Sequence, residues 1–275
     1  MGLVNSIFAT VQFEILRVLT LRRLSVAIIM ALFPPTMLFW LQAGGALASP
    51  GFIITLFCGM VCLLSLLLWS TSNVYAELEG KSWAFITSRP YGRWSILFGK
   101  FLVAFLVSFI ISWVALSLCM VVTGDLDFNI LNDGKEVPKM QVWLSLSGLL
   151  FLASMVYAAI FSLLGVLIQR RAMAIAVVFF TVVEVVFAVI PAVVGKFAMS
   201  FHMFCLLTHW VGWVPPSAGQ NEDANEILQD FLNVYGRQDA WVHLVVIFAT
   251  TVLSLSVAAY VICKREYITL EDSQV

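Results

Sequence analysis

The sequence predicts an all-α integral membrane protein, and three observations support this fold class: its composition, its length and its hydrophobic pattern. Of the 275 residues, 61% are hydrophobic and only 11% are charged, whereas soluble domains carry about 25% charged residues. A soluble chain of this length has no core large enough to hide so much apolar surface. We therefore expect lipid to surround most of it, and the short alternating segments typical of transmembrane strands are absent from the sequence.

The first element expected is an N-terminal helix over residues 1–23. Ser6, Thr10, Glu14 and Arg17 recur at spacings of four, four and three residues. This spacing forms a polar stripe along one helix face, while apolar residues cover much of the remainder. The pattern is typical of an amphipathic helix in the membrane–water interface. An extension of the first membrane span is the alternative, and we expect no cleavable signal peptide before it.

Six apolar stretches reach the roughly 20 residues that a helix needs to cross a bilayer. They are residues 24–46, 52–74, 99–123, 141–168, 172–195 and 240–262. Within the first stretch, Pro34 and Pro35 each remove a backbone donor, so we expect a kink or break there. The two prolines could form a hinge, a translocation path or an interface, or they could only adapt the shape of the helix.

Positive charge indicates how the chain is oriented in the membrane. If the six stretches span, eleven of the 15 basic residues lie on one side: Arg17, Arg22, Arg23, Lys81, Arg89, Arg93, Lys100, Arg170, Arg171, Lys264 and Arg265. The other side holds Lys135, Lys139, Lys196 and Arg237, together with nine acidic residues. Because basic loops stay in the cytoplasm, we expect a multi-pass protein of the cell (inner or plasma) membrane with both termini cytoplasmic.

A long connection over residues 196–239 precedes the last predicted span, on the outer side. Residues 197–214 are apolar and aromatic but too short for a confident span, which favours a re-entrant or interfacial segment. Asp223 and Glu226 resemble a capping box, and apolar residues then follow at helical spacing as far as Gly236. We expect a short amphipathic helix there.

Few residues in the sequence suggest chemistry of their own. The sequence has no phosphate-binding loop, no HExxH, no CxxC and no G-x-S-x-G pattern. Glu184 is an acid deep inside a predicted span, so it could line a translocation path, carry a proton, or form a hydrogen bond within the chain or at a dimer interface. His202 and His209 are seven residues apart and could share a helix face, either as metal ligands or as hydrogen-bonding histidines.

One polar stretch stands out between the second and third predicted spans. It contains Glu77, Glu79, Gly80, Trp83, Pro90, Arg93 and Lys100. Residues 76–88 suit a short helix that the following proline would end, and the basic residues flank the start of the third span. A solvated loop helix with basic residues at the lipid headgroups is the alternative interpretation.

In these residues the chain resembles the membrane subunits of ABC-2 type transporters. Many of them have an acidic segment ending in Gly after the second span, then Pro, Arg and Lys, which Glu77, Glu79, Gly80, Pro90, Arg93 and Lys100 match. The expected topology agrees over essentially the whole chain, residues 1–275, as one transmembrane domain. One departure is that the Gly-Thr-Leu usual after the acids is Gly80-Lys81-Ser82-Trp83 here, which leaves the subfamily open.

The resemblance implies that the chain is the permease of a transporter and that residues 76–90 are its coupling helix. A separate cytoplasmic ATPase subunit would hold ATP and Mg²⁺, and this chain would bind no cofactor or metal and catalyse no reaction. The permease would pair with a second copy or a paralogue in the bilayer, with no nucleic-acid partner, and would export its substrate. Two alternatives are a non-transporting scaffold or assembly factor and a membrane enzyme using Glu184 or the outer histidines.

Overall fold

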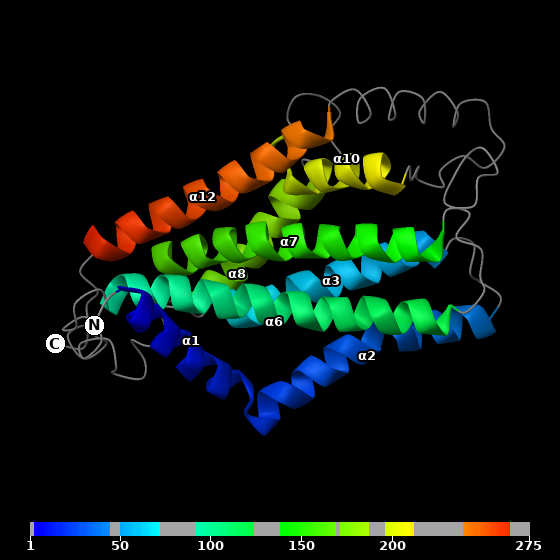
Figure 1. Cartoon of the computed structure of the whole chain (residues 1–275), viewed down its shortest axis with the longest axis horizontal. Coiled ribbons are helices and arrows are strands. Elements are labelled where there is room, and N and C mark those ends of the chain that lie inside the picture. The colour runs from blue at the N-terminus through cyan, green and yellow to red at the C-terminus, as the bar shows by residue number, and fades with distance from the viewer. Residues whose placement is uncertain are drawn as a thin grey trace.

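The computed structural model describes residues 3–44, 50–71, 92–123, 138–168, 171–186, 196–211 and 239–264. Within these ranges every regular element is a helix (Figure 1), which confirms the all-α prediction. The elements are α1 (Leu3–Val18), α2 (Leu21–Ala43), α3 (Pro50–Ser70), α6 (Gly92–Val122), α7 (Lys139–Leu167), α8 (Ala172–Phe179), the π-helix η1 (Phe180–Val186), α10 (Met199–Val211) and α12 (Ala240–Lys264).

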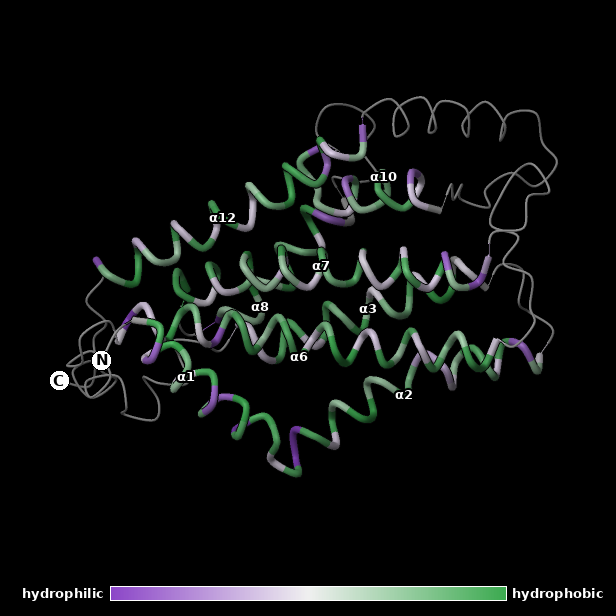
Figure 2. Tube along the Cα trace, in the orientation of Figure 1, coloured by the Kyte–Doolittle hydropathy of each residue, from purple (hydrophilic) through white to green (hydrophobic). Residues whose placement is uncertain are grey.

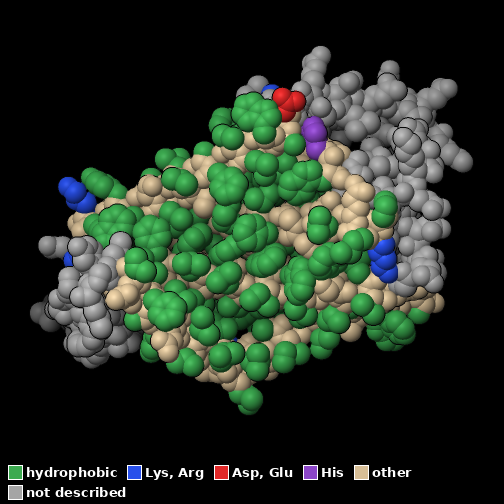
Figure 3. All heavy atoms as spheres, in the orientation of Figure 1, with side chains coloured by type: hydrophobic (Ala, Val, Ile, Leu, Met, Phe, Trp, Pro, Cys, Tyr) green, Lys and Arg blue, Asp and Glu red, His purple; other side chains and the backbone are tan. Residues whose placement is uncertain are grey.

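Five of the described helices, α2, α3, α6, α7 and α12, are long and apolar enough to cross a membrane. Figure 2 shows that their residues are mostly hydrophobic along their length. On the face drawn in Figure 3, hydrophobic side chains cover most of the described surface, and the few charged ones lie towards the edges. A chain with these surfaces is a multi-pass membrane protein, because only lipid is a suitable solvent for them.

The predicted span at 172–195 differs from the other five. Its described part has α-helical geometry only as far as Phe179 and continues as the π-helix η1 to Val186. Residues 187–195 lie outside the described residues, so the sixth span stays a prediction. In Figure 1, α7 and α12 run in the same direction, and α8 and η1 lie on the part of the chain that returns between them.

Helices α6 and α7 form the centre of the molecule. Helix α6 contacts α1, α2, α3, α7 and α12, and α7 also contacts α3, α8, α10 and α12. Fully buried Leu66, Leu116 and Phe161 belong to one apolar core shared by α3, α6 and α7. Polar bonds fix α3 on α7, because the Ser70 hydroxyl donates to the Ala158 carbonyl oxygen over 3.1 Å.

The first span passes through its two prolines without a break. Helix α2 is continuous from Leu21 to Ala43, so the break that the sequence suggested is not found. The buried residues of α2 are Ala31, Pro34, Pro35 and Leu38, which recur at helical spacing and form one stripe. Because α2 packs on α3 and α6, this stripe places the prolines in a helix–helix contact. A role of the two prolines as a hinge or in a translocation path stays a prediction.

Helix α1 is separate from α2. The chain turns at Leu19–Thr20, where Thr20 has extended backbone angles (φ −63°, ψ 141°), and the two helices form a V in Figure 1. The first span therefore does not continue into α1. Helix α1 lies against α6, and its position relative to a membrane surface stays a prediction.

Candidate functional site

The polar face of α1 is turned towards the protein. Glu14 is 7% exposed, whereas Val4, Phe8 and Leu16 on the other side of the helix are 76%, 70% and 62% exposed. A helix at the surface of a soluble protein would show the reverse arrangement. The polar stripe predicted from the sequence therefore contacts α6, and the apolar face of α1 is exposed.

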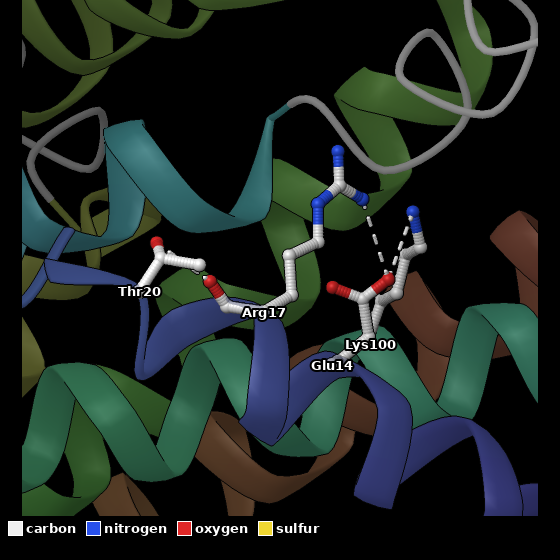
Figure 4. Close-up of polar contacts among 4 residues, drawn as sticks. All are labelled: Glu14, Arg17, Thr20 and Lys100. Carbon is white, nitrogen blue, oxygen red and sulfur yellow. Dashed lines mark hydrogen bonds and ion pairs between the residues drawn. The ribbon is translucent and has the colours of Figure 1, made fainter. Parts of the chain in front are cut away.

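An ion pair joins α1 to α6 near the beginning of α6. The Nζ atom of Lys100 lies 3.4 Å from Oε1 of Glu14, and a guanidinium nitrogen of Arg17 lies 3.6 Å from the same oxygen. Figure 4 shows both basic side chains directed at the carboxylate. The side chains of Lys100 and Glu14 are only 6% and 10% exposed. Water screens such a pair little, so the attraction is stronger than at an open surface.

Close backbone packing accompanies this ion pair. The Thr10 hydroxyl donates to the Ser6 carbonyl oxygen over 3.0 Å and lies 3.3 Å from the Ser95 hydroxyl oxygen. A Cβ atom added at Gly99 would lie 2.7 Å from Cγ2 of Thr10, closer than real contacts allow. Glycine at this position therefore lets α1 approach α6. We call the set Thr10, Glu14, Ser95, Gly99 and Lys100 the α1–α6 polar contact.

Arg93 joins the start of α6 to the end of α12. Its guanidinium donates to the carbonyl oxygens of Cys263 and Ile262, over 2.7 and 3.4 Å. These carbonyls belong to the last turn of α12, where the helix has no intrahelical donors to offer them. The cation also faces the negative end of the helix dipole. Arg93 thus caps α12 from a different helix.

Of the residues proposed to couple to an ATPase, the structure describes two. Arg93 and Lys100 both lie at the start of α6 but contact different partners, α12 and α1. Glu77, Glu79, Gly80, Trp83 and Pro90 lie outside the described residues, and the coupling helix at 76–90 lies there too. Lys100 is buried in a contact within the chain, so its described contacts connect helices of this molecule.

Glu184 caps the N-terminus of α10. Its Oε1 accepts a hydrogen bond from the backbone N–H of Met199 over 3.1 Å, and its Oε2 accepts one from Ser200 over 2.8 Å. Free N–H groups and a positive dipole make a helix N-terminus a good site for a carboxylate. The buried acid therefore has partners within the chain, and a role in a path or dimer interface stays a prediction.

The histidines form hydrogen bonds between α10 and α12. Nδ1 of His202 lies 2.9 Å from Nδ1 of His243, and Nε2 of His202 lies 3.1 Å from the Lys196 carbonyl oxygen. His209 instead bonds the Cys205 carbonyl oxygen of its own helix over 2.8 Å. In the described part of the chain, no group of three or more His, Cys, Asp or Glu residues could hold a metal ion. The observed contacts favour the hydrogen-bonding interpretation.

Five apolar helices that are long enough to span a membrane define a polytopic membrane protein. At the start of α6, Arg93 links two of them, α6 and α12, and Lys100 links α6 to the additional helix α1. Comparison with protein families adds the particular group. The model of the ABC-2 family transporter protein matches residues 8–266, which is nearly the whole chain. The chain therefore belongs to the ABC-2 transporter family, whose members are generally non-catalytic membrane subunits of ABC transporters. Comparison with curated proteins gives no match.

Proposed function

We propose that this chain is the permease subunit of an ABC exporter in the cell membrane. It pairs with a second copy or a paralogue and binds a separate cytoplasmic ATPase, which holds ATP and Mg²⁺. Family membership supports the permease role. The export direction and the cytoplasmic position of both termini rest on the family resemblance and on the unequal distribution of basic residues.

The observation that carries this proposal is the network of polar contacts at the start of α6. Residues 76–90, the proposed coupling helix, come directly before α6, which begins at Gly92. Arg93 then bonds the end of α12, and Lys100 pairs with Glu14 of α1. A displacement of residues 76–90 therefore acts on α6, α1 and α12 together.

The contacts suggest how ATP energy reaches the spans. ATP binding closes the ATPase and moves the coupling helix, which biases the membrane helices between two arrangements. Because α6 also packs on α2, α3 and α7, its movement changes contacts across the bundle. Arg93 and the α1–α6 polar contact make the first part of that movement concerted.

The test is purification of the tagged chain from its native cells in mild detergent, with ATP hydrolysis measured on the eluate. We expect a stoichiometric ATPase. Glu79→Ala should remove the ATPase from the eluate, because residue 79 lies in the proposed coupling helix. Arg93→Ala should leave the ATPase bound but lower transport-coupled hydrolysis about tenfold, the effect of losing one charge-assisted hydrogen bond.

Arg22→Ala is the matched control for Arg93→Ala. Arg22 is an exposed base at the start of α2, and its replacement removes the same charge without touching α12. A well-folded chain that elutes without any ATPase would contradict the permease proposal. An ATPase that binds but shows no transport-coupled hydrolysis would instead favour a scaffold or assembly factor.

A further inference from the structure

An apolar cavity lies between α10 and the central helices. Its volume is about 130 Å³, and residues of α3, α6, α7 and α10 line it, among them Gly59, Leu116, Leu150, Met203 and Leu207. The cavity is partly open rather than sealed. It lies away from the α1–α6 polar contact, towards the end of the bundle where α6 ends and α7 begins.

The lining of the cavity suits hydrocarbon and not water. A buried water needs two to four polar partners. Thr55 is among the lining residues, and its hydroxyl already donates to the Gly51 carbonyl oxygen over 2.8 Å. A dry cavity of about 150 Å³ lined by aliphatic residues takes up benzene. The space here therefore fits one ring or the end of one hydrocarbon chain.

Gly59 is the residue that keeps this space open. A Cβ atom at Gly59 would meet no atom within 4 Å, whereas one at Gly165 would lie 2.8 Å from the Thr71 carbonyl oxygen. Close helix packing thus explains the glycine at 165 but not the one at 59. Glycine weakens a helix interior relative to alanine, so Gly59 carries a cost in helix stability. No close contact offsets that cost, and the cavity is the structural feature that Gly59 serves.

One wall of the cavity comes from the short helix α10. Met203, Phe204 and Leu207 come from α10, a short helix that Glu184 caps from the π-helix η1. π-Helical geometry is rare and is frequently found at functional sites. The flexible side chain of Met203 adapts to apolar groups of different shape. The wall from α10 therefore adapts to an apolar guest through its side chains, while the cap holds the start of the helix in place.

We propose that this cavity receives the hydrocarbon part of an amphiphile that the protein transports. This inference rests on the proposed function and names the class of substrate: molecules with an alkyl chain or ring that partition into the bilayer. The chain enters the space between α3 and α10, while the polar part of the molecule stays outside it. A resident lipid chain that never leaves is the competing occupant.

The first experiment tests binding without any ATPase. The purified chain in phosphatidylcholine nanodiscs is photolabelled with a palmitic acid that carries a diazirine near its methyl end, and labelled peptides are identified by mass spectrometry. We expect label on α3 and α10. Gly59→Leu should lower that label about tenfold, which corresponds to excluding about two buried methylene groups. Met60→Leu is the matched control, because Met60 neighbours Gly59 but is 51% exposed on the outside of the bundle.

The second experiment separates a transported chain from a resident one. The complex with its ATPase is labelled without nucleotide and again after trapping with ATP and vanadate. A transported chain predicts a severalfold fall in the α3 and α10 label on trapping, and unchanged label overturns the substrate assignment. Equal labelling of wild type and Gly59→Leu overturns the cavity itself. Absence of any ATPase contradicts the permease proposal, and the nanodisc experiment still decides whether the cavity binds hydrocarbon.

Discussion

At the scale of single residues, Glu14 and Lys100 carry opposite charges into a region that little water reaches. Their side chains are 10% and 6% exposed. Burying a charge costs free energy that its partner must offset, so removing one partner leaves the other in an unfavourable site. The ion pair forms only when α1 packs on α6. Replacing Glu14 therefore removes the carboxylate that both Lys100 and Arg17 contact.

We expect Glu14→Gln to destabilise the chain by about 2 kcal/mol, in the range for a hydrogen bond to a charged group. The amide keeps the size of the carboxylate but loses its charge, so two cations lie beside a neutral group. Thermal unfolding of the purified chain in detergent measures the effect. Arg22→Gln, at an exposed position on α2, should change stability by less than about 0.5 kcal/mol. Equal effects of the two variants would show that the buried ion pair contributes nothing specific.

His202 should make the stability of the chain depend on pH. Burial lowers the pKa of His202 below its ordinary value of 6.5, although the hydrogen bond to the Lys196 carbonyl and the charge of Glu184 act in the opposite direction. Neutral His202 is thus favoured in the folded chain, and the unfolded chain binds an extra proton below pH 6.5. Stability is full above that pH and falls as the pH drops further towards the lowered pKa.

Thermal unfolding between pH 7.5 and 5.5 tests this expectation. The unfolding temperature of the wild type should fall with pH, and His202→Gln should flatten the dependence while keeping a hydrogen-bonding side chain next to His243. His209→Gln is the control, because His209 bonds its own helix at Cys205. If His202→Gln leaves the pH dependence unchanged, the titrating group lies elsewhere.

At the scale of helices, two glycines in the central helices have opposite surroundings, and only Gly165 lies at a close approach of backbone. Gly165→Ala should destabilise the chain by about 1–3 kcal/mol through overpacking, since its Cβ would lie 2.8 Å from the backbone oxygen of Thr71, just after α3. Gly59→Ala should leave stability unchanged or raise it by up to about 1 kcal/mol, because its Cβ meets nothing within 4 Å and alanine favours a helix. Unfolding of the two variants under one set of conditions measures both, and a similar loss in each would refute the distinction.

The position of α10 should depend on the Glu184 carboxylate. In Glu184→Gln one acceptor oxygen becomes an NH₂ group, which would face the N–H of Met199 or Ser200 and cannot accept from it. A cost of about 2 kcal/mol follows from the unpaired donor. Hydrogen exchange should then speed up at the amides of 199 and 200 while α7 is unaffected. Unchanged protection of these amides would mean that the cap does not position α10.

The sequence predicted helices well where polar or apolar residues recur at helical spacing along one element. The stripe of Ser6, Thr10, Glu14 and Arg17 indicated a helix, but not that its polar side would bind α6, because periodicity defines a face and not its partner. Glu184 was recognised as a buried acid, yet its partners Met199 and Ser200 lie 15 and 16 residues away. No local signal in the sequence marks such a contact. The π-helical geometry of η1 likewise has no sequence signature that we could use.

At the scale of the whole molecule, the start of α6 connects elements that are far apart in sequence. Arg93 bonds carbonyls 169 and 170 residues further along the chain, and Lys100 pairs with Glu14 near the other end of the sequence. In Figure 1 the beginnings of α1 and α6 and the end of α12 lie at the same end of the bundle. Arg93 and Lys264 lie at this end, which is the side where a cytoplasmic partner is proposed to bind.

This arrangement predicts that the two ends of α12 face opposite sides of the membrane. The helix has 25 residues, about 37 Å at 1.5 Å per residue, which exceeds the roughly 30 Å of bilayer hydrocarbon. In a background where the five native cysteines are replaced by alanine, single changes Asp239→Cys and Lys264→Cys place one thiol at each exposed end. A membrane-impermeant maleimide should label Asp239→Cys in intact cells but Lys264→Cys only after lysis, since basic segments stay in the cytoplasm. The reverse pattern would invert the orientation and remove the ATPase from the side of Arg93 and Lys100, whereas labelling of both in intact cells would mean that α12 does not span.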